Sequence, residues 1–284
     1  LTLGDGESMP LKRDTNRLIF GGTMLQVRNE RGTLVYSRIK SKEASEKIVY
    51  NTLTVPVRER FQLVLADGTK VFLNSGSEMR YPERFGKARR EVFLKGEAWF
   101  EVAKDSAREF WVHAGAMDVK VLGTSFNVKA YERLETVATT LVEGSVEVAC
   151  AGKSFQIVPG EQFVYDKNNR VMDVRMVDTE SYVSWKDGYY KFRQTTLEEI
   201  METLSVWYGL NVFYVNESAK QVEFTGKVKR YEDARMLLDK FEQTGDVVFD
   251  IKGNNVFITI KQKKPFAREW NSFLVKARGM VWQS

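Results

Sequence analysis

The chain has 284 residues, of which 43% are hydrophobic and 29% are charged, and only five are prolines. This composition is typical of a folded protein with one large or two ordinary domains, and it excludes a disordered or linker-dominated chain. Its apolar runs are far shorter than the roughly 18 to 20 residues that cross a bilayer, so no segment is expected to span a membrane.

The net charge of +5 is concentrated at the C-terminal end. Six of the 43 basic residues and one of the 38 acidic residues follow Ile260, which leaves 37 of each sign before it. Because this body is balanced and has no basic stripe, we expect no nucleic-acid binding. The chain begins at Leu1 without a signal-peptide pattern, which favours a mature or excised fragment. The single cysteine, Cys150, excludes an internal disulfide and is expected to be a small apolar residue at a strand end.

From Arg17 to about Arg175, short apolar runs of period two alternate with turn residues. This pattern predicts many short strands that form a β-sandwich, a roll or a β-solenoid. Glycine adopts positive φ at little cost, so the chain is expected to reverse at Asp67-Gly68, Lys95-Gly96, Glu143-Gly144 and Pro159-Gly160. In particular, 91–94 and 98–102 are expected to be two strands on either side of a turn.

Near Asp178 the pattern changes to strands that alternate with helices. A capping box at Thr196–Glu199, apolar residues at helical spacing up to Tyr208 and a C-cap at Gly209 predict an amphipathic helix. The order is strand 189–193, this helix, strand 210–215, strand 222–228, helix 231–243, strand 247–251 and strand 256–260. Two βαβ-like units therefore predict a small α+β domain with its helices on one sheet face.

The expected division is a β-rich domain over residues 1–178, a small α+β domain over 179–260 and a basic amphipathic tail over 261–284. One helical face of the tail would carry Trp270, Phe273, Leu274, Ala277 and Val281, surrounded by cations. Two interpretations of the tail remain open. It is either a segment packed back on the body or an amphipathic helix that binds an interface or a partner.

The side chains that enzymes use are scarce in this chain. The single histidine, His113, excludes a two-histidine metal site, and no glycine-rich phosphate-binding motif is present, so no metal or cofactor is expected. A pair of carboxylates could hydrolyse a glycoside, and Glu97, Glu101, Glu143 and Glu161 all lie beside predicted strands. Three of them adjoin turn glycines, so we interpret them as solvated turn residues. We therefore expect a protein that is not an enzyme and has no small-molecule substrate.

The tryptophans Trp99, Trp111, Trp185 and Trp207 allow a second interpretation. A row of aromatic rings on a β-sheet could stack sugar rings, which would make the chain a carbohydrate-binding β module. Packing in the sheet core and between domains accounts better for these rings, because most of them fall on the apolar phase of their strands or helices.

Five ordered sequence blocks carry a family resemblance: 65–74 (LADGTKVFLN), 92–102 (VFLKGEAWFEV), 121–128 (VLGTSFNV), 140–146 (TLVEGSV) and 158–162 (VPGEQ). Together they resemble FecR-type anti-sigma regulators. The later region, with Gly188, Phe192, 197–200 (LEEI) and Trp207-Tyr208, resembles the C-terminal domain of the Bacteroidetes branch. That domain is similar to the short signalling domain at the N-termini of secretins and TonB-dependent transducers. The chain departs from the family at 57–60, where a glycine-containing turn is expected.

The resemblance implies that the motif residues form structural turns. These residues are Asp67, Gly68, Thr69, Asn74, Gly96, Glu97, Phe100, Gly123, Thr124, Phe126, Glu143, Gly144, Pro159, Gly160 and Glu161. It also implies the periplasmic part of a single-span inner-membrane regulator, whose cytoplasmic anti-sigma segment lies outside this chain and binds an extracytoplasmic-function sigma factor. Its periplasmic part would receive a signal from a TonB-dependent outer-membrane transducer.

A sheet edge in the α+β domain is the candidate surface for that transducer. An exposed edge can pair with a partner's strand through main-chain hydrogen bonds. The candidate edge strand is 222–228, with Val222, Phe224, Gly226 and Val228 as partner-binding residues.

Overall fold

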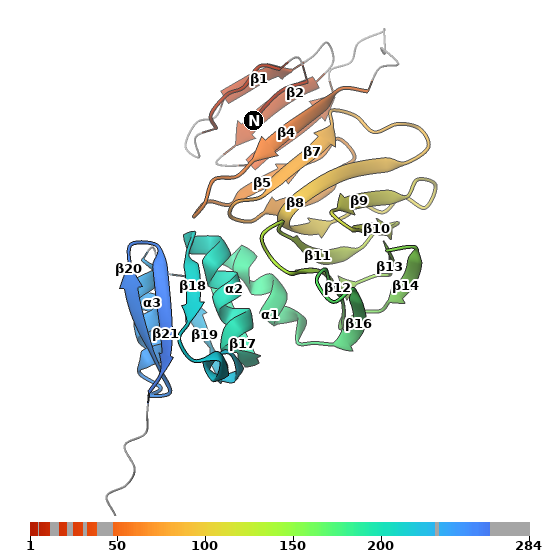
Figure 1. The fold of residues 1–284 in the computed structure, drawn as a ribbon. Helices are drawn as coiled ribbons and strands as arrows, with labels where there is room; N and C mark the ends of the chain where they lie inside the picture. The colour runs from red at the N-terminus through yellow and green to blue at the C-terminus, as the bar shows by residue number, and fades with distance from the viewer. Residues whose placement is uncertain are drawn as a thin grey trace, which may run out of the picture.

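The computed structural model describes residues 1–4, 6–11, 17–21, 25–30, 33–38, 48–230 and 233–261 (Figure 1). The basic tail beyond Lys261 and the first residues of the helix expected at 231–243 lie outside these described residues.

Residues up to 176 form the predicted series of strands. Their bounds are β1 Arg17–Gly21, β2 Leu25–Glu30, β3 Thr33–Arg38, β4 Tyr50–Thr54, β5 Phe61–Val64, β6 Lys70–Leu73, β7 Glu78–Pro82, β8 Arg90–Glu101, β9 Phe110–Ala114, β10 Met117–Val121, β11 Ser125–Ala130, β12 Thr136–Glu143, β13 Val146–Cys150, β14 Lys153–Ile157, β15 Glu161–Asp166 and β16 Val171–Met176. The β-rich fold expected from the period-two pattern is confirmed.

These strands form two sheets that share β8. One sheet has the order β4-β7-β8-β9-β10-β13-β14, and the other runs β1-β2-β3-β5-β6-β8-β11-β12-β15-β16. Rings from the two sheets meet in one core, where Phe100 lies 6.2 Å from Phe110 and Phe155 lies 5.0 Å from Phe163 between ring centroids. Of the arrangements that the sequence left open, this face-to-face packing matches a sandwich.

Strand β8 corrects the expectation of a turn at Lys95-Gly96. It is one strand of 12 residues, whose first half pairs with β7 and β9 and whose second half pairs with β6 and β11. Gly96, at φ +107°, lies where the strand passes from one sheet to the other, and a Cβ there would stand 2.7 Å from the Ser77 Cα. Glycine is therefore needed for a bend and a close backbone approach, because no side chain fits there.

The C-terminal part contains the predicted alternation of strands and helices. Its elements are α1 Thr179–Val183, η1 Ser184–Asp187, β17 Tyr189–Thr196, α2 Leu197–Tyr208, β18 Asn211–Tyr214, η2 Glu217–Gln221, β19 Glu223–Lys229, α3 Ala234–Glu242, β20 Val247–Lys252 and β21 Asn255–Ile260. Helix α2 has the expected caps: the Glu199 N–H donates to Thr196 Oγ1, and Gly209 adopts the left-handed conformation.

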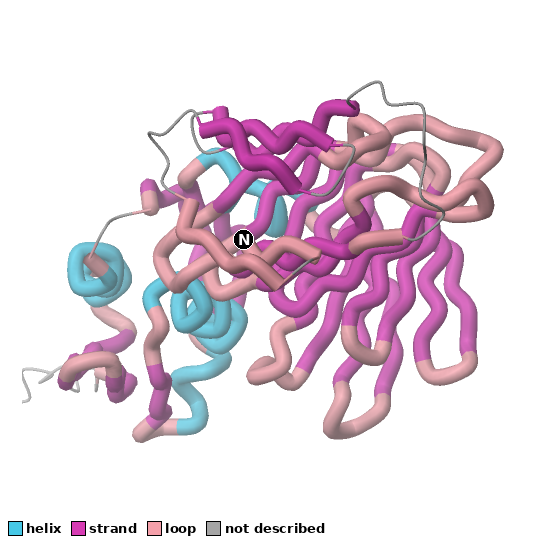
Figure 2. The backbone as a smooth tube through the Cα atoms, turned by 90° about the horizontal axis from the view of Figure 1, so that it is seen from above, coloured by secondary structure: helices cyan, strands magenta, loops and turns pink. Residues whose placement is uncertain are grey.

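Two of the strand pairings in this part join the first βαβ-like unit to the later strands: β17 pairs antiparallel with β19, and β18 pairs parallel with β21. The third is a local hairpin, in which β20 pairs antiparallel with β21. A two-stranded and a three-stranded sheet therefore replace the single sheet that the sequence order suggested. Figure 2 shows the helices gathered on one side of the molecule, away from most strands of the sandwich.

A second apolar core holds the C-terminal elements together and reaches into the sandwich. It contains Leu197, Ile200 and Leu204 of α2, and also Trp99 of β8. The indole of Trp99 is buried in this second core although its strand belongs to the sandwich. The C-terminal elements are thus packed directly against one face of the larger sheet.

Candidate functional site

A buried ion pair fixes the first family motif. The Asp67 carboxylate accepts hydrogen bonds from the Thr69 main chain and hydroxyl, at 3.0 and 2.8 Å, and from the Arg90 guanidinium at 2.8 Å. Arg90 is fully buried and also donates to the carbonyl oxygens of Ala103 and Arg108. Sequence reasoning missed Arg90, because a single charged residue beside a strand carries no signal of its burial.

The motif residues Asn74 and Glu97 lie in a polar network between the two parts of the chain. The Glu97 carboxylate accepts a hydrogen bond from the Asn74 amide at 2.8 Å and one from the Asn127 amide at 2.9 Å. The Asn127 carbonyl oxygen accepts from the Trp185 indole N–H at 3.2 Å, which links the sandwich to η1. We call Asn74, Ser75, Glu97, Asn127 and Trp185 the interdomain joint.

Glu97 is buried at the interdomain joint, which corrects the expectation of a solvated turn carboxylate. Burial raises the pKa of Glu97 above its ordinary value, and the nearby Lys129 ammonium and the two amide hydrogen bonds oppose that rise only in part. The reason for the difference is that β8 does not turn at Gly96, so Glu97 stays inside the strand and lines a cavity together with Trp185 and Tyr190 of the C-terminal part.

Ser75 ties the sandwich to the end of helix α2. Its hydroxyl lies 3.1 Å from the Val206 carbonyl oxygen and 3.3 Å from that of Trp207, and the Tyr131 hydroxyl donates to the Ser75 carbonyl at 2.8 Å. The last carbonyls of a helix have no partner within the helix itself. A residue of the sandwich therefore helps to satisfy the C-terminal end of α2.

The departure from the family at 57–60 also contacts the joint. Arg58 adopts φ +68°, a conformation that favours glycine, and its N–H donates to the Ser75 hydroxyl at 3.0 Å. The turn expected of the family is thus formed by a residue other than glycine.

The remaining motif residues have packing and turn roles in the sandwich. Phe100 and Phe126 are buried and stacked with ring centroids 5.2 Å apart, and the Glu161 carboxylate accepts from the Val158 N–H at 2.9 Å. A surface cavity of about 220 Å³ brings four others together, namely Gly68, Gly123, Thr124 and Glu143. Pro159 and Gly160 lie in the loop before β15.

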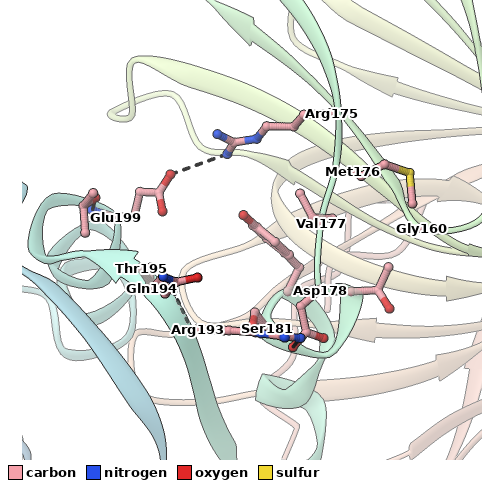
Figure 3. A pocket seen from close by; sticks show the side chains of 13 residues that line it. Gly160, Arg175, Met176, Val177, Asp178, Ser181, Arg193, Gln194, Thr195 and Glu199 are labelled. Carbon is pink, nitrogen blue, oxygen red and sulfur yellow. Dashed lines mark hydrogen bonds and ion pairs between the residues drawn. The ribbon is translucent and has the colours of Figure 1, made fainter.

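A cleft lies between the end of β16, the segment 177–182 that follows it and the start of α2 (Figure 3). Its volume is about 710 Å³, and it adjoins a more enclosed cavity of about 360 Å³ that reaches Glu97. In Figure 3 the Arg175 and Glu199 side chains point toward each other across the cleft, 3.4 Å apart. Deeper in, Lys129 of β11 lies 3.6 Å from Glu202 of α2. Two cations of the sandwich thus face carboxylates on one side of α2.

The candidate partner edge lies on the two-stranded sheet. Strand β19 pairs only with β17 among the described strands. The Arg230 N–H donates to the Gly188 carbonyl, and in an antiparallel ladder hydrogen-bonded pairs alternate, so the main-chain groups of Lys227 and Lys229 face away from β17. Of the four predicted contact residues, Phe224 is buried, Val228 is half-buried, Gly226 is exposed and Val222 lies just before the strand.

Three of the four tryptophans that could have formed a stacking row are buried, and the fourth, Trp111, stacks on His113 with ring centroids 6.2 Å apart. Trp99, Trp185 and Trp207 are buried in the second core, and Trp111 is half-buried beside Lys120. His113 is half-buried, with its ring nitrogens 2.7 Å from Asp118 and 3.4 Å from Glu91. The Cys150 thiol is buried at the end of β13, and burial raises its pKa.

None of the helices in the described part of the chain is long and apolar enough to cross a membrane. In the same residues, no group of three or more histidine, cysteine, aspartate or glutamate side chains is arranged to hold a metal ion.

A β-sandwich and a small α+β part that share a buried joint define the class of fold, and the comparisons agree with it. The model of the FecR protein family matches residues 51–147, and the model of the FecR C-terminal domain matches residues 189–258. Two crystal structures of a candidate anti-sigma factor from Parabacteroides distasonis are similar, each with a TM-score of 0.67. Their sequences are 28% and 27% identical to this chain, over 74% and 75% of it and 99% of theirs. No curated protein matches.

The two family models lie in the same order as the two structural parts and together cover more than half of the chain. The chain belongs to the FecR family.

Proposed function

We propose that this chain is the periplasmic sensor part of a single-span inner-membrane anti-sigma regulator. It receives a signal from the signalling domain of a TonB-dependent outer-membrane transducer. The output is control of an extracytoplasmic-function sigma factor, through a cytoplasmic segment outside this chain. Membership of the FecR family and the similarity to a candidate anti-sigma factor support this proposal.

The edge of β19 that faces away from β17, with which no strand in the described ranges pairs, is the observation that carries the proposal. A strand with one unpaired edge offers main-chain donors and acceptors to a partner strand. Lys227 and Lys229 present these groups. The Lys227 ammonium lies 3.9 Å from the Glu180 carboxylate, whereas the exposed Lys229 favours an acidic partner strand. A binding surface of this kind needs no catalytic group, which agrees with a regulator that is not an enzyme.

We further propose that residues 1–178 and 179–260 act as two domains with different tasks. The α+β domain binds the transducer, and the sandwich passes the resulting change on toward the membrane. The interdomain joint connects them, because the Glu97 carboxylate and the Ser75 hydroxyl each take part in hydrogen bonds that lead across the boundary.

Lys227→Pro tests the edge. Proline lacks the N–H that Lys227 directs away from β17. An edge strand tolerates proline at such a position, because the hydrogen bonds between β17 and β19 stay intact. We expect the affinity for the purified transducer signalling domain, measured by calorimetry, to fall about tenfold, the effect of losing about 1.4 kcal/mol.

Lys227→Ala is the matched control, because it removes the same charge and keeps the N–H. It should weaken binding less than Lys227→Pro. Equal affinities of the parent and the proline variant, with unchanged circular dichroism, would reject β19 as the docking edge.

A further inference from the structure

The enclosed cavity of about 360 Å³ that reaches Glu97 lies between the two parts of the chain. Strands β8, β11, β12 and β15 of the sandwich form one wall, and α1, β17 and α2 form the other. The wider cleft of Figure 3 adjoins it, since Arg175, Ser181 and Glu199 line both. Small-molecule sites have volumes of about 300 to 1,000 Å³ and are common at domain boundaries. We call this space the inner cavity.

Carboxylates outnumber cations around the inner cavity. Six acidic and three basic side chains line it, and one of the three, Lys191, is paired with carboxylates outside the lining, among them Asp178 at 3.1 Å. Between β8, β11 and α2, the single ammonium of Lys129 serves both Glu97 and Glu202, and it lies 3.6 Å from the latter. Burial raises the pKa of both carboxyls, and Lys129 opposes that rise only in part. A further cation would favour their charged forms, which burial disfavours.

Two hydroxyl groups at the inner cavity lack a hydrogen-bond partner. They belong to Tyr190, which is only 4% exposed, and to Ser181, and both oxygens are buried without a partner among the described residues. Burial raises the pKa of Tyr190, the Arg230 guanidinium opposes that rise and the Glu97 carboxylate adds to it, so the hydroxyl lies within electrostatic reach of Glu97. Buried polar groups are normally hydrogen-bonded, so these two oxygens are free to bond to a ligand.

A small organic cation fits this lining better than an anion, a sugar or a metal ion. An anion would add to the surplus of carboxylates. A sugar needs an open ring face, but Trp185 is buried in the second core and Tyr190 is stacked on Phe192, with ring centroids 6.1 Å apart. No group of carboxylates among the described residues is arranged to hold a metal ion. An ammonium group only donates hydrogen bonds, and the carboxylates and the two hydroxyls can all accept them.

We propose that the inner cavity binds a small organic amine, whose positive charge is balanced by Glu97 and Glu202, with the Tyr190 and Ser181 hydroxyls as further acceptors. The amine contacts both parts of the chain at once, because Glu97 belongs to β8 and Glu202 to α2. Its binding therefore stabilises the arrangement of the two parts described above. The site is separate from the β19 edge and does not depend on the proposed function.

Calorimetric titration of the full chain with 1,4-diaminobutane tests the proposal. The matched neutral compound is 1,4-butanediol, and glucose represents the sugars. We expect saturable binding of the diamine at one site and no binding of the diol or of glucose. The diamine should also raise the urea midpoint of unfolding, because it binds the folded chain only.

Two variants locate the binding site. Glu202→Gln removes a partly buried charge, so the affinity for the diamine should fall at least about tenfold. Tyr190→Phe should weaken binding about threefold to tenfold through the loss of one acceptor. Its urea midpoint without ligand should not fall, because the lost hydroxyl has no partner in the free chain. Glu101→Gln is the control, since this carboxylate of β8 lies outside the inner cavity, and it should bind like the parent.

Absence of diamine binding to the parent chain would overturn the proposal. Equal affinities of the parent, Glu202→Gln and Tyr190→Phe would place the diamine elsewhere and would also overturn it. Binding of glucose or of the diol as tight as that of the diamine would contradict the assignment of a cationic ligand.

Discussion

At the scale of single residues, Glu97 has the most unusual environment of the motif residues. A buried carboxylate is costly unless it is hydrogen-bonded, and two asparagine amides offset only part of that cost here, since the pKa of Glu97 stays raised. Glu97 belongs to a sequence motif, but its burial could not be predicted from that motif. The residues around Gly96 are typical of a turn, and a carboxylate beside a turn is usually solvated. Asn127 lies 30 residues along the chain from its acceptor Glu97, and Trp185 lies 58 residues from its acceptor Asn127. Such contacts depend on tertiary packing that no local pattern specifies.

Glu97→Gln should change how stability depends on pH. Because the folded protein holds the pKa of Glu97 above its unfolded value near 4.5, the native carboxyl keeps its proton where the unfolded chain has lost it. Its stabilising contribution is therefore complete below the unfolded pKa and is lost as the pH rises through the folded one. Urea unfolding from about pH 4 to about pH 8 should show a steeper fall for the parent than for Glu97→Gln.

Glu101→Gln provides the comparison, because it alters a more exposed carboxylate on the same strand. Its pH profile should follow that of the parent. If Glu97→Gln and the parent lose stability in parallel over this range, Glu97 is not held as the structure describes.

At the scale of elements, the local signals in the sequence predicted most strands and the helix α2 with both of its caps. The pairing of the elements was harder to predict. β17 pairs with β19 across helix α2 and β18, and the parallel pairing of β21 with β18 joins residues more than 40 positions apart. A βαβ-like order in sequence fixes neither choice, because partner selection depends on which apolar faces can be buried together.

The cap that Ser75 provides to α2 has a measurable consequence. Ser75→Ala leaves the Val206 and Trp207 carbonyls without this donor, so we expect a loss of about 1 kcal/mol and faster amide exchange in the last turn of α2. The matched control Thr203→Ala removes a hydroxyl that bonds within the same helix, to the Glu199 carbonyl. A larger loss from the control than from Ser75→Ala would contradict the role of Ser75 at the joint.

At the scale of the whole molecule, two cores meet along a boundary that is both apolar and polar. Trp99 crosses it as part of the second core, and the joint crosses it through hydrogen bonds. The two ion pairs in the cleft, Lys129–Glu202 and Arg175–Glu199, are partly exposed and contribute less than about 1 kcal/mol each. The buried contacts therefore hold the two parts together. A structural change caused by partner binding at β19 can be transmitted to the sandwich through this packed interface.

Hydrogen exchange of the full chain, with and without the purified transducer signalling domain, tests whether the partner docks on β19. We expect protection of β17 and β19, together with a change in exchange around Asn74 and Glu97 at the joint. Protection confined to the sandwich, or full binding by residues 1–178 alone, would contradict it.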